Sequence, residues 1–135
     1  MERQKKVLDA SVVMKWFTNE DNTEKAIKLR EQHINQEIEI IMPEFAILEI
    51  INGLRYKKKV ESELKETAKN LAKIQLTTVS LTTDQLQKTI KIALDNDLSI
   101  YDSLYAAVAQ LNGCILITAD KDLAKLQNSL ALDKI

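Results

Sequence analysis

A continuous apolar run near the C-terminus constrains the fold more than any other feature of this sequence. Residues 114–118 read Cys-Ile-Leu-Ile-Thr, and the Asn112-Gly113 pair before them is a typical helix end. A short apolar segment bounded in this way is expected of a strand that is buried on both faces of a parallel sheet. Parallel strands need crossover connections, usually helices, so the chain should alternate strands with helices.

The remainder of the sequence supplies that alternation. Further strands are expected at residues 6–9, 38–42 and 77–81, with an edge strand over 130–135. Helices are expected at 11–17, 22–36, 43–58, 61–75, 82–94, 102–111 and 120–126. Such a pattern predicts an α/β domain of three layers, α/β/α, with a central, mainly parallel sheet of four to five strands. With 135 residues and no linker or repeat, residues 1–135 are interpreted as a single domain.

Composition excludes several kinds of site. The single histidine, His33, excludes a two-histidine nuclease site and is interpreted as an exposed residue of a polar helix. The single cysteine, Cys114, excludes an internal disulfide and a cysteine-based zinc site. Two glycines leave no glycine-rich loop for a nucleotide phosphate, and a net charge of −1 gives no overall positive field. Carboxylates remain as the groups able to carry demanding chemistry.

No targeting segment is recognised in the sequence. The apolar stretch near the N-terminus is interrupted by Asp9 and Lys15, which is unlike a signal peptide. No run approaches the roughly 20 apolar residues that a membrane-spanning helix needs. A soluble, reduced, cytoplasmic protein is therefore expected.

Four acidic residues occupy positions where carboxylates can meet. Asp9 and Asp120 follow expected strands, and ligands of an open parallel sheet bind outside the carboxyl ends of its strands. Asp102 begins an expected helix, and Glu49 lies in the apolar segment 45–51, where burial without a partner is costly. Converging carboxylates repel one another unless a cation holds them, and Mg²⁺ or Mn²⁺ prefers such oxygen ligands.

Each of these acids also has an ordinary structural interpretation. Asp9, Asp102 and Asp120 can cap helices or lie in first turns, and Glu49 can line the polar edge of its helix. Taken singly, none is strong evidence for catalysis. The hypothesis of an acidic site depends on the whole set.

Four segments carrying these acids resemble the motifs of PIN domains, and most of all those of VapC-type toxins from prokaryotic toxin–antitoxin pairs. The segments are Val7-Leu8-Asp9-Ala10-Ser11, residues 43–52 with Glu49, residues 100–106 with Asp102, and Leu116-Ile117-Thr118-Ala119-Asp120. The resemblance implies a hydrolase, a metal-dependent endoribonuclease that uses Mg²⁺ or Mn²⁺ to cut RNA phosphodiesters. It implies that Asp9, Glu49, Asp102 and Asp120 are the catalytic, metal-binding cluster.

The resemblance also assigns supporting residues and partners. Thr118 and Ser11 occupy supporting hydroxyl positions, and Asn52 a polar position one helical turn after Glu49. Asp9 and Asp102 are expected as direct metal ligands, with Glu49 and Asp120 acting through water or a second ion. The implied partners are an RNA substrate, a VapB-type antitoxin inserted in the active-site groove, and a second copy of the chain in a homodimer.

Basic residues near the acids are candidate RNA contacts. Arg55, Lys57 and Lys58 belong to a dense basic run, which a solvated helix C-terminus explains at least as well as a phosphate track. Lys15 and Lys121 lie close in sequence to Asp9 and Asp120 and can steer phosphate.

Two other functions were weighed against the nuclease. A non-catalytic PIN-fold module that binds RNA or acts as a scaffold would leave the acids structural, and loss of an acidic position would favour it. A phosphoacceptor receiver domain needs adjacent acids after its first strand, whereas Asp9 has no acidic neighbour. The receiver is therefore rejected, and the scaffold stays as the alternative.

Overall fold

The core of the protein is a five-stranded sheet in which every strand pairs in parallel with its neighbours. The computed structural model describes residues 2–135. Along the sheet the order is β3-β2-β1-β4-β5. The strands are β1 (Gln4–Leu8), β2 (Ile38–Pro43), β3 (Thr77–Val79), β4 (Ile115–Thr118) and β5 (Ser129–Ala131). The prediction of a parallel α/β sheet is confirmed.

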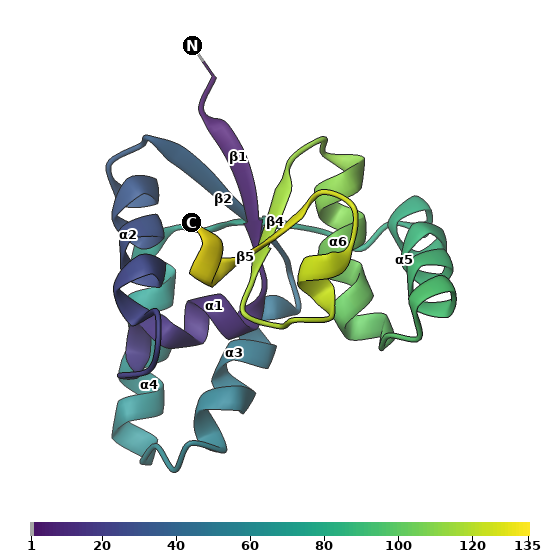
Figure 1. Ribbon diagram of the computed structural model, residues 1–135. Coiled ribbons are helices and arrows are strands. Elements are labelled where there is room, and N and C mark those ends of the chain that lie inside the picture. Colours follow the sequence, from purple (N-terminus) through teal and green to yellow (C-terminus); the bar gives the residue numbers. More distant parts are fainter. Residues whose placement is uncertain (1) are drawn as a thin grey trace.

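Six α-helices connect and cover these strands (Figure 1). They are α1 (Ala10–Met14), α2 (Thr23–Ile34), α3 (Ala46–Arg55), α4 (Glu61–Ile74), α5 (Thr83–Asn96) and α6 (Ile100–Leu111). Short 3-10 turns cover Lys15–Phe17, Leu123–Lys125 and Leu132–Lys134. Helices α1 to α4 link β1, β2 and β3 on one side of the sheet, whereas α5 and α6 return the chain on the other side to β4.

This winding places a switch point between β1 and β4. The chain leaves β1 toward β2 on one side, and it comes back past β1 to form β4 on the other. At such a point the connections diverge and open a crevice at the carboxyl ends of the strands. Leu8 is in register with Ile117, so the residues that follow β1 and β4 lie at the same level.

The hydrophobic core lies between the sheet and both helix layers. Both central strands are buried where they meet, with Val7, Leu8, Leu116 and Ile117 at most 2% exposed. Helix α6 is buried from Ser103 to Ala109 and packs on β1, β2 and β4. Small alanines let this helix approach the sheet closely, which brings its first turn to the crevice.

Close packing of α1 on α3 brings a second helix to the same edge. A Cβ added at Gly53 of α3 would lie 2.6 Å from the Met14 thioether at the end of α1. Glycine therefore leaves room for the Met14 side chain between the two helices. Glycine at this position therefore lets α3 approach the end of α1 closely. Helix α3 carries Glu49 and is thereby held against the segment that follows Asp9.

Two predicted helices are shorter than expected. Pro43 is the last residue of β2 rather than the start of a helix, because the ladder to β3 continues through Glu44, whose N–H donates to the Val79 carbonyl (3.0 Å). Residues 120–126 form only a short 3-10 turn, Leu123–Lys125. The expected edge strand is present as β5 but ends at Ala131.

His33 is buried, so its interpretation as an exposed residue was wrong. Its Nδ1 accepts a hydrogen bond from the Ile40 N–H (3.1 Å), and Nε2 lies 3.2 Å from the Gln75 carbonyl. Strand β3 pairs with β2 only from Ile41 onward, so β3 offers no acceptor for the Ile40 N–H. The imidazole of His33 accepts that hydrogen bond instead. His33 thus joins α2, β2 and the end of α4.

Candidate active site

Asp9 is the buried centre of the candidate site. It follows β1 and caps α1, with its Oδ1 accepting from the Val12 N–H (3.3 Å) and the Ser11 hydroxyl (2.5 Å). Its Oδ2 accepts from the Thr118 hydroxyl (2.5 Å) at the end of β4. Only 5% of the residue is exposed. Its carboxylate is therefore fixed in orientation from α1 on one side and from the end of β4 on the other.

The same two hydroxyl groups hold the loop after β4 against β1. Thr118 Oγ1 accepts from the Asp120 N–H (2.9 Å), and Ser11 Oγ accepts from the Ala119 N–H (3.2 Å). Each hydroxyl therefore donates to Asp9 and accepts from a backbone N–H of the loop that follows β4. Ser11 and Thr118, the two hydroxyl residues expected near the acids, thus both contact Asp9.

Asp120 lies at the exposed rim of the crevice. Its Oδ1 accepts from the N–H groups of Asp122 (2.8 Å) and Leu123 (3.1 Å), which closes a local turn and explains why no longer helix forms. Asp122, the other nearby acid, is exposed and pairs with Lys125.

Glu49 and Asp102 come from the helices on either side of the sheet. Both are half-buried. Asp102 lies in the first turn of α6, where its backbone N–H donates to the capping Ser99 hydroxyl (3.0 Å). Glu49 Oε1 accepts from the hydroxyl of Tyr105 (2.8 Å), a contact that joins α3 to α6.

Tyr105, the hydrogen-bond partner of Glu49, is not among the residues predicted for the site. A usable signal was present, since Tyr105 lies three residues after Asp102 and therefore on the same face of the helix. Asn52, which was predicted as a polar support after Glu49, is exposed on α3.

The carboxylates lie within electrostatic reach of one another. Burial raises the pKa of Asp9 from 3.8 to about 6 despite its hydrogen bonds, and the charge of Asp102 adds to the rise. Burial likewise raises the pKa of Glu49, again with a contribution from Asp102. Burial and then the charge of Asp120 raise the pKa of Asp102. Asp102 therefore links all four acids through one field of like charges.

The donor set suits a hard divalent cation. Carboxylate oxygens are the ligands that Mg²⁺ and Mn²⁺ prefer, and a cation would relieve the repulsion that raises these pKa values. Among residues 2–135, no three His, Cys, Asp or Glu side chains converge closely enough to enclose a metal ion by themselves. The chemistry of the donors thus fits a cation that keeps water among its ligands.

Lys15 and Lys57, two residues predicted to contact RNA, both pair with Glu20. Glu20 is not among the residues predicted for the site. Glu20 pairs with Lys15 (3.2 Å) and Lys57 (3.0 Å) and accepts from the Thr18 hydroxyl (2.6 Å). The Thr18 hydrogen bond first, and then the two lysines, lower the pKa of Glu20 to about 2. No sequence signal pointed to Glu20, because Lys57 is brought to it only by the fold.

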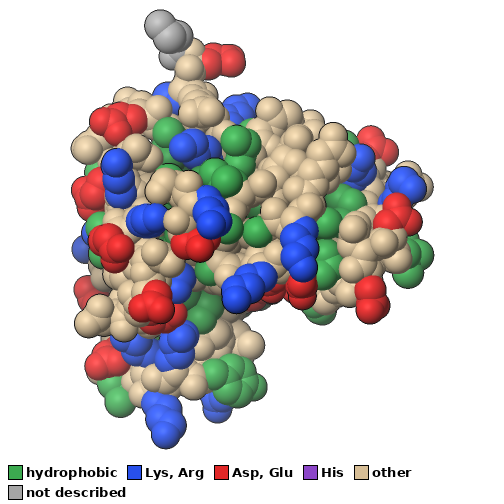
Figure 2. Space-filling view, in the orientation of Figure 1, with side chains coloured by type: hydrophobic (Ala, Val, Ile, Leu, Met, Phe, Trp, Pro, Cys, Tyr) green, Lys and Arg blue, Asp and Glu red, His purple; other side chains and the backbone are tan. Residues whose placement is uncertain are grey.

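The other predicted cations, Arg55, Lys58 and Lys121, are exposed. Figure 2 shows Lys and Arg side chains gathered at the lower end of the molecule, where α3 is joined to α4. A pocket of about 260 Å³ beside the site is lined by Lys15, Lys121, Thr118 and Asp120 among others. Lys15 and Lys121 therefore do lie next to the acidic rim.

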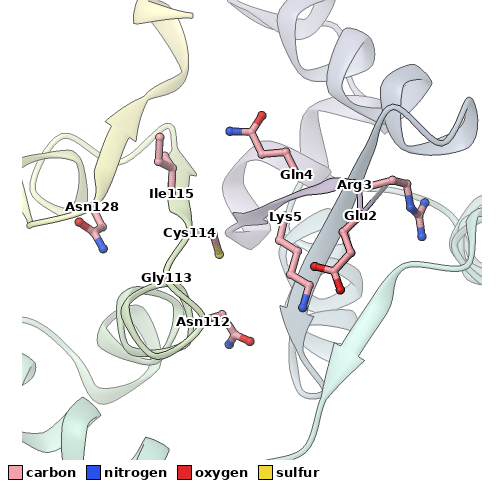
Figure 3. Close-up of a pocket in the computed structure, with 9 residues that line it drawn as sticks. All are labelled: Glu2, Arg3, Gln4, Lys5, Asn112, Gly113, Cys114, Ile115 and Asn128. Atoms are coloured by element: carbon pink, nitrogen blue, oxygen red, sulfur yellow. The ribbon is translucent and has the colours of Figure 1, made fainter.

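A larger pocket lies at the opposite edge of the sheet (Figure 3). It measures about 500 Å³ and is lined by residues at the amino ends of β1 and β4, including Lys5, Asn112 and Cys114. None of the predicted site residues lines it. Pocket size therefore does not identify the site here, whereas the carboxyl ends of the strands do.

The fold and site define a doubly wound α/β protein with a group of acidic side chains at its switch point. The sequence matches the family model described as the PIN domain over residues 6–128. The chain therefore belongs to the PIN domain family.

Solved structures agree with this assignment. PAE2754 from Pyrobaculum aerophilum is 25% identical, with a TM-score of 0.66 over 99% of this chain and 94% of that one. A toxin–antitoxin complex from Klebsiella pneumoniae gives 16% identity and a TM-score of 0.72 over 93% and 96%. The sarcin–ricin-loop-cleaving toxin VapC20 from Mycobacterium tuberculosis gives 14% and 0.67 over 87% and 92%.

No curated protein sequence matches the chain. Within residues 2–135, no helix combines the length and the apolar character needed to cross a membrane.

Proposed function

We propose that this protein is a metal-dependent endoribonuclease and the toxin of a type II toxin–antitoxin pair. The observation that carries the proposal is the placement of four carboxylates at the switch point, where Asp102 acts on the charges of Asp9 and Glu49, and where Asp9 is buried and held by hydrogen bonds from α1 and from the end of β4. A purely structural aspartate at that position would need neither burial nor acidic neighbours. Membership of the PIN family and the likeness to toxin folds support the same function.

In the proposed mechanism the four carboxylates hold Mg²⁺ or Mn²⁺, which supplies activation of water and neutralisation of charge at the phosphate. Asp9 and Asp102 would hold the ion directly, and Glu49 and Asp120 would act through water or a second ion. Thr118 and Ser11 keep the Asp9 carboxylate oriented, so that it need not reorganise when substrate binds. Asn52 is the additional polar support on α3.

RNA would reach the site across the basic residues nearby. Lys15 and Lys121 flank the acidic rim, and Arg55 and Lys58 are exposed at the end of α3. Lys57 contributes once a phosphate replaces its pairing with Glu20. Contacts of this kind neutralise backbone charge and make binding dependent on salt.

The proposed protein partners are a VapB-type antitoxin and a second copy of the chain. Likeness to the toxin–antitoxin complex from Klebsiella pneumoniae supports the antitoxin partner. Likeness to VapBC2 from Rickettsia felis, bound to a DNA fragment from its promoter, supports it as well (15% identity, TM-score 0.65, 95% of this chain and 97% of that one). Exposed apolar side chains support the homodimer. Leu81, Leu86 and Ile100 border an apolar pocket of about 270 Å³ between α5 and α6, and light scattering would test the dimer.

Cleavage of total cellular RNA by the purified, antitoxin-free chain tests the proposed activity. Cleavage is expected with Mn²⁺ or Mg²⁺, is abolished by EDTA, and is lost in Asp102→Asn. Asp122→Asn is the matched control, because it removes a nearby exposed charge that the proposed site does not use. RNA that stays intact with folded wild-type protein in both metals contradicts the nuclease and favours the non-catalytic module.

A further inference from the structure

Tyr105 is a buried tyrosine whose hydroxyl group serves one side chain. The residue is 1% exposed, and its ring packs against Phe45, with ring centroids 5.7 Å apart. Its hydroxyl donates to Glu49 Oε1 at 2.8 Å. Within residues 2–135, this hydroxyl is the sole hydrogen-bond donor to the Glu49 carboxylate.

Packing alone does not account for a tyrosine here. Residues 104–109 of α6 are otherwise Leu, Ala and Val, and a phenylalanine would fill the same space beside Phe45 without a polar atom. A buried hydroxyl is unfavourable unless it is paired, so its presence is explained by the carboxylate that it meets.

The contact also joins two elements that the sheet does not connect directly. Glu49 projects from α3, and Tyr105 projects from α6, which passes on the other side of the sheet. Asp102 lies one helical turn before Tyr105 on α6. A hydrogen bond between Tyr105 and Glu49 therefore sets the position of Glu49 relative to Asp102.

We propose that Tyr105 is a positioning residue that holds the Glu49 carboxylate in the acidic crevice, facing the same bound cation as Asp9 and Asp102. The inference rests on the proposed function, and it assigns Tyr105 a role that acts through Glu49 rather than on the substrate.

Tyr105→Phe and its matched control Tyr101→Phe test the inference. Tyr101 packs on the same Phe45 ring at the same centroid distance of 5.7 Å, but it is 65% exposed and contributes no hydrogen bond to the site. Mn²⁺ affinity is measured by calorimetry, and kcat and KM are measured on a mixed-sequence oligoribonucleotide. Denaturant unfolding shows whether each variant is folded.

Tyr105→Phe is expected to weaken Mn²⁺ binding and to lower kcat, each by about 10- to 100-fold, as loss of a residue that orients a ligand does. KM for the oligoribonucleotide should stay near the wild-type value, and Tyr101→Phe should change neither quantity. In a Glu49→Gln background the substitution should have little further effect, since its action passes through that carboxylate.

Wild-type Mn²⁺ affinity in folded Tyr105→Phe would overturn the inference, whatever the cleavage assay shows. Equal losses in the wild-type and Glu49→Gln backgrounds would also overturn it, because Tyr105 would then act independently of Glu49. A wild-type chain that binds Mn²⁺ but cleaves no RNA would contradict the proposed function alone. The two failures are therefore distinguishable.

Discussion

Replacement of Asp9 by Asn should change the pH dependence of stability in a defined direction. Burial raises the pKa of Asp9 from 3.8 to about 6 in the folded protein. Below 3.8 the carboxyl is protonated in both the folded and the unfolded chain. Between 3.8 and about 6 only the unfolded chain releases the proton, so the free energy of unfolding of the metal-free protein falls as pH rises.

The size of this effect follows from the pKa difference. One pKa unit corresponds to about 1.4 kcal/mol, so ionising Asp9 removes about 3 kcal/mol of stability by neutral pH, most of it lost between about pH 4 and 7. Asparagine carries no charge at any pH and lacks this loss. If the amide nitrogen of the asparagine faces Thr118, it cannot accept the hydrogen bond that the Thr118 hydroxyl donates to Asp9. The resulting loss of stability is independent of pH.

Urea denaturation in EDTA, repeated at intervals across this pH range, measures the effect. The quantity of interest is the free energy of unfolding of Asp9→Asn minus that of the wild type, since pH effects from other groups cancel in the difference. This difference should rise with pH by about 2 to 3 kcal/mol. A difference that stays flat, or falls with pH, would refute the argument that the ionised, buried Asp9 carboxylate lowers the free energy of unfolding.

Three further substitutions test other parts of the structure. Thr118→Val removes the donor to Asp9 and the acceptor for Asp120, so Mn²⁺ affinity by calorimetry should fall about 10- to 100-fold; unchanged affinity would exclude the orienting role. His33→Leu leaves the buried Ile40 N–H unpaired, and urea denaturation should show a loss of about 1–3 kcal/mol, whereas wild-type stability would contradict the contact. Lys58→Gln should reduce the salt dependence of RNA binding by about 0.7 in the log–log slope, and an unchanged slope would remove it from the RNA path.

Much of the fold could be predicted because local signals and the final structure agree. The apolar runs become β2 and β4, and Thr82 caps α5 with a capping box to Gln85. Gly113 adopts a positive φ of 62° just after α6, at the helix end that the Asn112-Gly113 pair predicted. The strand order, however, is set by long-range packing and could not be obtained from these local patterns.

The positions of the acids could be anticipated because Asp9, Asp102 and Asp120 stand at junctions before helices, and Glu49 is a carboxylate in an otherwise apolar helical segment. Asp9 and Asp120 follow strands that prove to be neighbours, and a sheet fixes where the ends of its strands lie. The partners of these acids were harder to foresee. The contact between Tyr105 and Glu49 spans 56 residues, and the pairing of Glu20 with Lys57 likewise depends on the tertiary fold.

The errors have local causes. A polar segment around His33 is typical of an exposed helix face, and only the late start of the β3 ladder creates a buried place for its imidazole. Asp120 was expected to begin a longer helix, but its side chain satisfies the N–H groups of just one turn.

Mn²⁺ binding by four amide variants tests most directly whether the acids form one site. Calorimetric titrations would compare the wild type with Asp9→Asn, Glu49→Gln, Asp102→Asn and Asp120→Asn, and with Asp122→Asn as the control. A shared site predicts weaker Mn²⁺ binding in all four variants and wild-type affinity in the control. Wild-type affinity in the four variants, or no Mn²⁺ binding by the folded wild-type chain, would contradict the account.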